Sequence, residues 1–213
     1  MFTNDINFDI NSRLDHNLKT YKALQIGNID VYLCPKCGTN SARYASYKFN
    51  GGDLEVPDVR DLTKNDYNIL RMGPDSILKY EKERTDSIKV AIKRDPVERF
   101  VSAYAWYNHK YGEIQNLIIK KSLDETIKSP PNDIHYLPQS SFYGNDISKY
   151  DYVIYPSELR KLILDITSID LGPLHKGQTR FTLESGYTYK TLTDEQNIKA
   201  TQLYKIDYDN GYF

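Results

Sequence analysis

Four stretches of the chain combine β-branched, aliphatic and aromatic residues in runs of strand length. The runs are IDVYLC (29–34), YNILRM (67–72), SIKVAIK (87–93) and DYVIY (151–155). Such residues are enriched in strands, so each run predicts one. The first run stops at Pro35, because proline has no N–H to continue a strand ladder.

Helical spacing of apolar residues is found after the strands. The predicted helices cover about 40–47, 97–111 and 156–166, and a last helix begins at Thr193. Pro96 suits the first position of the second helix, where its missing N–H has no partner in any case. The TDEQ sequence at 193–196 has the form of a capping box.

Two of these helices have a face that we expect to be buried, because apolar residues recur at helical spacing. The inward positions of helix 97–111 are Phe100, Val101, Tyr104 and Tyr107 with Asn108. Those of the last helix are Ile198, Leu203 and Ile206.

The alternation of strands and helices predicts an α/β fold with a central parallel sheet flanked by helices, because parallel strands need crossover connections. No internal repeat is found, and glycine and proline are scattered along the 213 residues. We therefore expect one domain over residues 1–213. The stretches 49–66 and 168–192 are expected to be loops, of the kind that cover active sites.

Charge and hydropathy narrow the range of partners. The chain has 28 basic and 29 acidic side chains, so bulk charge favours neither nucleic acid nor an anionic membrane. It contains no apolar run of about 18 residues, and its start lacks the basic and apolar pattern of a secretory signal. We expect a soluble, cytoplasmic protein, and the sequence does not indicate an oligomeric state.

The stretch LCPKCGTNS (33–41) allows three interpretations. A structural zinc site needs four ligands, but Cys34 and Cys37 are the only cysteines and the four histidines are scattered singly. A redox dithiol is the second interpretation, since CPKC lies between a predicted strand and a predicted helix, a placement that lowers a thiol pKa. Cys34 can equally be a small buried hydrophobic residue.

The third interpretation is a loop that binds a phosphate at a helix N-terminus. Such a loop needs small residues, a cation and hydroxyls around exposed backbone N–H groups. The stretch supplies them with Lys36, Cys37, Gly38, Thr39, Asn40 and Ser41. It departs from the nucleotide-binding signature GxxxxGK[ST], because its lysine precedes the glycine. A magnesium-dependent nucleotide or nucleoside kinase stays open as the weaker alternative.

A second group of residues lies in KRDPVERFVSAY (93–104). Arg94 is predicted to end the third strand, and Ser102 lies about two helical turns further on. A guanidinium and a hydroxyl at this spacing can bind one phosphate at the carboxyl edge of a parallel sheet. Arg99 is interpreted as a helix-surface or buried ion-pair residue, and Trp106 as a core residue, with a stacking platform as the alternative.

Together, the two stretches carry a family resemblance. PKCGTNS (35–41) resembles the loop that binds the 5′-phosphosulfate in sulfotransferases, and KRDPVERFVSAY resembles their 3′-phosphate motif in its carbohydrate sulfotransferase form. Later blocks are similar to the family as well, namely HYLPQSSFYG (135–144), YDYVIYPSELRKLI (150–163) and LYKIDYDNGYF (203–213). The resemblance implies a P-loop-NTPase-like sulfotransferase fold.

The resemblance also implies an activity. It implies transfer of a sulfuryl group from 3′-phosphoadenosine 5′-phosphosulfate, without a metal, to a hydroxyl or amine of an acceptor, expected to be a carbohydrate. By matched position, Lys36 contacts the bridging oxygen and 5′-phosphate, and residues 37–41 donate to the same phosphate. The expected 3′-phosphate ligands are Arg94 and Ser102, joined by Lys176 or Arg180 of HKGQTR (175–180).

Sulfuryl transfer to a hydroxyl also needs a general base, normally a histidine or a glutamate. His135 is the first candidate, because it lies with Gln139 in one of the matched blocks. Glu55 or an aspartate of DVRD (58–61) is the alternative.

Overall fold

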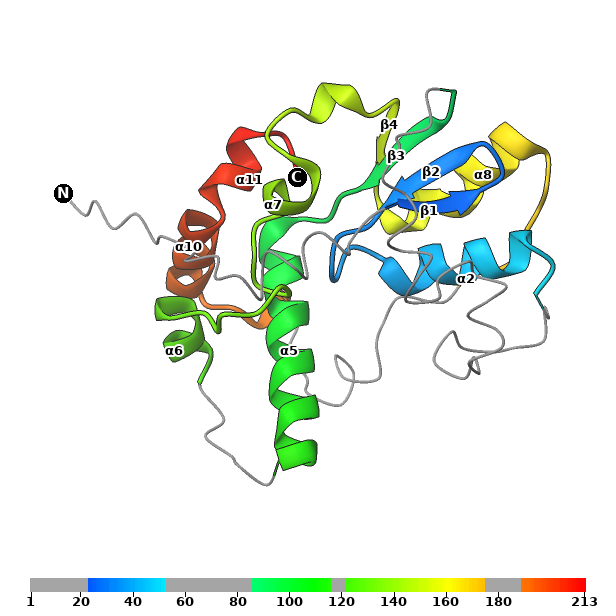
Figure 1. The fold of residues 1–213 in the computed structure, drawn as a ribbon. Helices are drawn as coiled ribbons and strands as arrows, with labels where there is room; N and C mark the ends of the chain where they lie inside the picture. The colour runs from blue at the N-terminus through cyan, green and yellow to red at the C-terminus, as the bar shows by residue number, and fades with distance from the viewer. Residues whose placement is uncertain (1–22, 53–85, 116–121, 175–188) are drawn as a thin grey trace.

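The computed structural model describes residues 23–52, 86–115, 122–174 and 189–213. A four-stranded sheet with the strand order β1-β2-β3-β4 lies among helices (Figure 1). The strands are β1 (Ala23–Ile26), β2 (Ile29–Tyr32), β3 (Ile88–Ile92) and β4 (Tyr152–Ile154). Three of them lie within the predicted strands 29–34, 87–93 and 151–155. The predicted strand 67–72 lies outside the described residues.

The sheet is mixed, which corrects the prediction of a wholly parallel sheet. Strands β2, β3 and β4 run parallel as predicted, but β1 pairs antiparallel with β2. Only Gly27 and Asn28 separate β1 from β2, and a two-residue connection can join only antiparallel neighbours. Gly27 has φ 60°, as the first position of such a hairpin turn can require. A β-carbon there would also lie 2.9 Å from the ring of Phe49.

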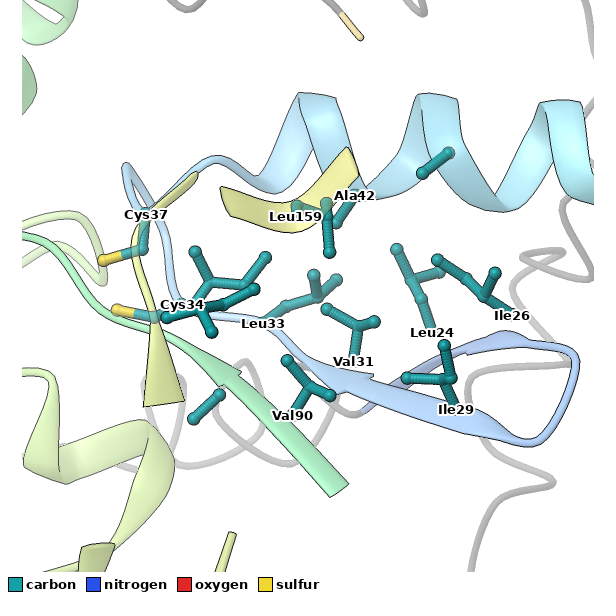
Figure 2. Packing of buried hydrophobic residues seen from close by; sticks show 14 of the residues in the cluster. Leu24, Ile26, Ile29, Val31, Leu33, Cys34, Cys37, Ala42, Val90 and Leu159 are labelled. Atoms are coloured by element: carbon teal, nitrogen blue, oxygen red, sulfur yellow. The ribbon is translucent and has the colours of Figure 1, made fainter. Parts of the chain in front are cut away.

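A first apolar cluster packs between the sheet and the helices α2 (Thr39–Phe49) and α8 (Leu159–Thr167) (Figure 2). Both helices were predicted, and the first turn of the predicted helix 156–166 is the 3₁₀ turn η3 (Pro156–Glu158). Each fully buried aliphatic side chain of this kind contributes roughly 1.5–3 kcal/mol. The cluster includes Leu24, Ile26, Val31, Leu33, Ala42, Val90 and Leu159.

A second apolar cluster joins the helices α5 (Pro96–Gln115), α6 (Leu123–Lys128) and α10 (Asp194–Leu203). Helix α5 begins at Pro96 as predicted. Its predicted inward residues Phe100, Val101 and Tyr104 are buried, and Tyr107 packs against the cluster.

The start of α10 confirms the predicted capping box, in which Thr193 and Gln196 bond to each other's backbone N–H groups. The predicted inward face of this helix is wrong, since Ile198 and Ile206 are 58% and 44% exposed. Ala200 and Tyr204, one turn apart, are buried instead. Ile198 lies on the opposite side of the helix from Ala200, and Ile206 belongs to the separate helix α11 (Lys205–Asp209). Leu203 is partly buried against the second cluster.

The C-terminal segment returns to the carboxyl end of β3. It runs beside α7 (Ser140–Tyr143) in Figure 1. The Tyr143 hydroxyl donates to the carbonyl of Ile92 at 2.8 Å, and the Tyr212 hydroxyl donates to that of Gly144 at 2.6 Å. Lys93 also donates to the carbonyl of Phe213. Two further 3₁₀ turns are η2 (Ile147–Lys149) and η4 (Tyr189–Thr191).

Phe100 offers a test of the second cluster. It is fully buried, and its ring contacts those of Tyr136 and Tyr204 at centroid distances of 5.8 and 6.0 Å. We expect Phe100→Ala to lower the free energy of unfolding by about 3–5 kcal/mol, measured by urea denaturation, because it leaves a cavity. Ile198→Ala is the control, with an expected change within about 0.5 kcal/mol. Equal losses in the two variants would contradict the burial described above.

Candidate functional site

The segment between β2 and α2, residues 33–38, forms a tight loop at the carboxyl end of β2. The Cys37 N–H donates to the Cys34 carbonyl at 3.1 Å and closes a four-residue turn. The Thr39 hydroxyl donates to the same carbonyl at 2.9 Å. The predicted phosphate-binding stretch is therefore a closed loop whose end leads directly into a helix.

Two residues of this loop have left-handed backbone conformations. Gly38 has φ 76°, and a β-carbon there would lie 2.8 Å from Cβ of Pro156. Glycine therefore relieves both backbone strain and a steric clash at this position. Lys36 has φ 68°, a conformation that costs a non-glycine residue roughly 1 kcal/mol and that clusters at functional sites.

The N-terminus of α2 is open to an anion. Its N-cap residue is Gly38, no side chain caps the helix, and its first turn has no acidic residue. The first N–H groups of a helix have no partner within the helix, and they carry partial positive charge. Ser41 is buried in the first turn, and Asn40 is half-buried.

Arg94 brings the second predicted motif to this loop. It follows β3, and its Nη1 donates to the Lys36 carbonyl at 3.1 Å. Its Nε lies 3.5 Å from Glu98, one turn into α5. A guanidinium has more N–H donors than these two contacts use, so Arg94 can also donate to a bound phosphate. Ser102 is buried further along α5.

The side chain of Gln139 connects three segments that are distant in sequence. Its Oε1 accepts from the Cys37 thiol at 3.2 Å and from the Arg94 N–H at 3.0 Å. Its Nε2 donates to the carbonyls of Arg94 and Tyr212 at 2.8 and 3.1 Å. The whole residue is buried, so these bonds replace solvation that the amide has lost.

Arg99 is a buried cation behind the loop. Its Nε donates to the Pro35 carbonyl at 2.9 Å, and its Nη atoms have no hydrogen-bond partner among the described residues. Burial opposes its charge, but the nearby thiols and Asp207 outweigh burial and raise the pKa of Arg99 above its ordinary value. Asp207 is also buried, and it accepts from the N–H groups of Gln139 and Ser140. Arg99 is therefore buried, but among the described residues its guanidinium bonds to a backbone carbonyl and does not form the predicted ion pair.

A second group of residues gathers around Trp106, which agrees with its interpretation as a stacking platform and corrects that of a core residue. Trp106 is half-buried, and the ring of His135 stacks on it at a centroid distance of 4.2 Å. Nζ of Lys36 lies 5.3 Å from the centroid of the same indole, within the range of a cation–π contact. Trp106 therefore brings the predicted cation and the predicted base to one place.

Asp133 orients the imidazole of His135. Nδ1 of His135 lies 2.5 Å from Oδ1 of Asp133, which also accepts from the His135 backbone N–H at 2.8 Å. Burial raises the pKa of Asp133, but the hydrogen bonds from His135 outweigh burial, and the net pKa is lowered. The carboxyl group is therefore ionised, and Nδ1 carries the proton that is shared with it. Nε2 is left as the basic nitrogen.

The pKa of His135 is itself lowered. Burial is the main cause, and the charge of Lys36 acts in the same direction. The hydrogen bond and charge of Asp133 oppose this shift without cancelling it. The imidazole is therefore neutral at neutral pH, as a general base requires.

Several predicted site residues lie outside the described residues. They are Lys176, Arg180, Glu55 and the aspartates of 58–61. In the part of the chain that the structure describes, no three His, Cys, Asp or Glu side chains form a group that could hold a metal ion.

Sequence reasoning missed two contributors to the site. Asp133 precedes His135 by two residues, and this short spacing could have predicted that the carboxylate orients the imidazole. The contacts of Asp207 could not be predicted in this way, because its partners Gln139 and Ser140 lie 68 and 67 residues away in the sequence.

Taken together, these elements define an α/β protein in which the uncapped N-terminus of α2 and a loop with Lys36 lie at the carboxyl edge of the parallel strands β2, β3 and β4. A profile of the sulfotransferase family matches residues 35–209, which is more than half of the chain. The chain therefore belongs to the sulfotransferase family. No curated protein and no solved structure matches it significantly.

The family membership supports sulfuryl transfer in general. Each helix within the described ranges is too short or too polar to cross a membrane.

The contribution of the Gln139 carboxamide to stability can be tested with Gln139→Leu. This variant keeps much of the side-chain volume but removes four hydrogen bonds. We expect a loss of about 2–4 kcal/mol in the free energy of unfolding, because buried backbone groups lose their partners. Gln196→Leu is the matched control, since Gln196 is half-buried and caps a helix, and we expect it to cost about 1 kcal/mol or less. A Gln139 variant as stable as the Gln196 variant would contradict this role.

Proposed function

We propose that this protein transfers a sulfuryl group from 3′-phosphoadenosine 5′-phosphosulfate to a hydroxyl group, on a carbohydrate acceptor. The observation that carries the proposal is the position of Lys36 and His135 against the same indole ring. In-line transfer needs a cation at the leaving group and a base at the acceptor, on the two sides of the group transferred. Family membership supports the reaction class.

The donor site consists of two parts. Lys36 and residues 37–41 bind the 5′-phosphosulfate, through the side chain of Lys36 and the N–H groups at the start of α2. In the free protein the Thr39 hydroxyl donates to the Cys34 carbonyl, so this group must rotate to serve a phosphate. Arg94 and Ser102 bind the 3′-phosphate, and Lys176 stays a proposed third ligand.

Catalysis consists of one displacement at sulfur. His135 accepts the acceptor's hydroxyl proton at Nε2 while the hydroxyl oxygen forms a bond to sulfur. The bond between sulfur and the bridging oxygen breaks, and Lys36 stabilises the negative charge that develops on the released 5′-phosphate. Asp133 stabilises the imidazolium, because its Oδ1 accepts from Nδ1. No residue of this scheme requires a metal ion.

The donor proposal is tested by calorimetric binding without metal. We expect 3′-phosphoadenosine 5′-phosphate to bind more tightly than AMP or ATP, because only the bisphosphate occupies both parts of the site. Arg94→Ala should weaken this binding by about 10- to 100-fold, because it removes a charge-assisted hydrogen bond to the 3′-phosphate.

Arg160→Ala is the matched control, because Arg160 forms an exposed pair with Asp170 instead. Equal affinity for the bisphosphate and AMP would overturn the proposal. Preferential ATP binding that depends on magnesium would favour a kinase.

The base is tested by kinetics once an acceptor has been found in a carbohydrate screen. We expect His135→Asn to lower kcat by roughly 100-fold or more, with little change in donor affinity. In the wild type, activity should fall with decreasing pH below about 6.5, the ordinary pKa of histidine, because burial lowers the pKa of His135.

Asp133→Asn should move this acidic limb to still lower pH, because the carboxylate favours the protonated imidazole. His109→Asn is the matched histidine control and should leave the profile unchanged. An unchanged limb in Asp133→Asn would remove His135 from the role of base.

A further inference from the structure

Cys34 and Cys37 occupy the two ends of the turn that closes the loop 33–38, called the donor loop below because it belongs to the proposed donor site. The N–H···O bond between them, at 3.1 Å, identifies a β-turn whose ends lie within about 7 Å at Cα. Disulfides need Cα separations of about 4.4–6.8 Å, a range that overlaps the separations found in such turns. Their side chains leave the turn on the same side, with the two sulfur atoms next to each other (Figure 2).

The two thiols have different environments. Burial raises the pKa of the Cys37 thiol, but its hydrogen bond with Cys34 and the charges of Arg99 and Arg94 outweigh burial, and the net pKa is lowered. Burial dominates at Cys34, whose pKa is raised. A thiolate is the reactive form of cysteine, so Cys37 is the more nucleophilic of the two.

We propose that Cys34 and Cys37 form a reversible dithiol–disulfide pair that controls the conformation of the donor loop. The oxidant is a low-molecular-weight disulfide such as oxidised glutathione. The Cys37 thiolate attacks one sulfur of the oxidant, which gives a mixed disulfide and one released thiolate. Cys34 then loses its proton and attacks Sγ of Cys37, and the second thiol leaves. Two cysteine thiols are oxidised for each small disulfide reduced to two thiols.

Disulfide formation changes contacts on both sides of the loop. The Cys37 thiol donates to Oε1 of Gln139, and this hydrogen bond is lost when the sulfur becomes part of a disulfide. The same amide holds the backbone of Arg94. Lys36 lies between the two cysteines in a left-handed conformation, with its ammonium near Trp106. Forming the disulfide between Cys34 and Cys37 therefore changes the surroundings of Lys36 and Arg94 together.

The competing interpretation is that both cysteines only fill space. Each is 1% exposed, and both belong to the first apolar cluster. Burial means that an oxidant reaches them only when the loop opens locally, so oxidation should be slower than at an exposed thiol. Burial does not explain why two thiols lie next to each other across a turn beside a buried cation.

The chain is well suited to a direct test, because it contains two cysteines and one tryptophan. The full chain is equilibrated without denaturant in mixtures of reduced and oxidised glutathione, quenched with acid and alkylated, and its intact mass is measured. We expect both thiols to disappear together, with the mass of a disulfide. Trp106 fluorescence should change with the same midpoint, because Lys36 lies 5.3 Å from its ring.

The controls separate this pair from other effects. Cys34→Ala and Cys37→Ala cannot form the disulfide, so neither should show the fluorescence transition. Two thiols that stay alkylatable in the folded protein but oxidise in denaturant would overturn the proposal. So would a glutathione adduct on one cysteine without the internal disulfide. A disulfide that leaves Trp106 fluorescence unchanged would show that the pair does not control the loop.

The effect on donor binding rests on the proposed function, whereas the thiol and fluorescence measurements do not. We expect the oxidised protein to bind 3′-phosphoadenosine 5′-phosphate roughly three- to tenfold more weakly, the equivalent of one lost hydrogen bond. If the redox transition occurs but neither form binds the bisphosphate, the donor assignment fails and the dithiol pair stands. Equal binding by both forms would overturn the control of the donor loop.

Discussion

The buried carboxamide of Gln139 is the interaction on which the site depends. A planar amide has an acceptor at one end and donors at the other, and here both ends bond to other segments. It bonds to the loop after β2, to the segment after β3 and to the C-terminus, across 102, 45 and 73 residues of sequence. Because the residue is buried, each bond lost would leave a polar group without solvent or partner.

Two buried ionisable side chains make a second polar contribution behind this amide. Arg99 supports the donor loop through the Pro35 carbonyl, and Asp207 holds the two N–H groups at the start of α7. Buried charges are costly unless they are compensated, and here each of the two side chains is hydrogen-bonded to the backbone. The site therefore lies where a polar network separates the two apolar clusters.

In the proposed mechanism, this arrangement combines donor binding and catalysis on few residues. Helix α5 provides Arg99 behind the loop and Trp106 beside it, so one rigid element positions both Lys36 and His135. The proposed cation and base are thus placed before any ligand binds, and such preorganisation would reduce the reorganisation required during transfer. The dithiol that we propose lies in the same loop.

The sequence by itself determined the parallel strands 87–93 and 151–155, the helix starts at Pro96 and Thr193 and the open helix N-terminus after Gly38, because these depend on local preferences. It also indicated Lys36, Arg94 and His135 as candidate site residues, through their match to the sulfotransferase motifs. Only the tertiary structure decided that Ala200 and Tyr204 face inward, and that Gln139, Trp106 and Asp207 assemble the site. The reason is physical: these features depend on partners many residues away, and local sequence preference carries no information about them.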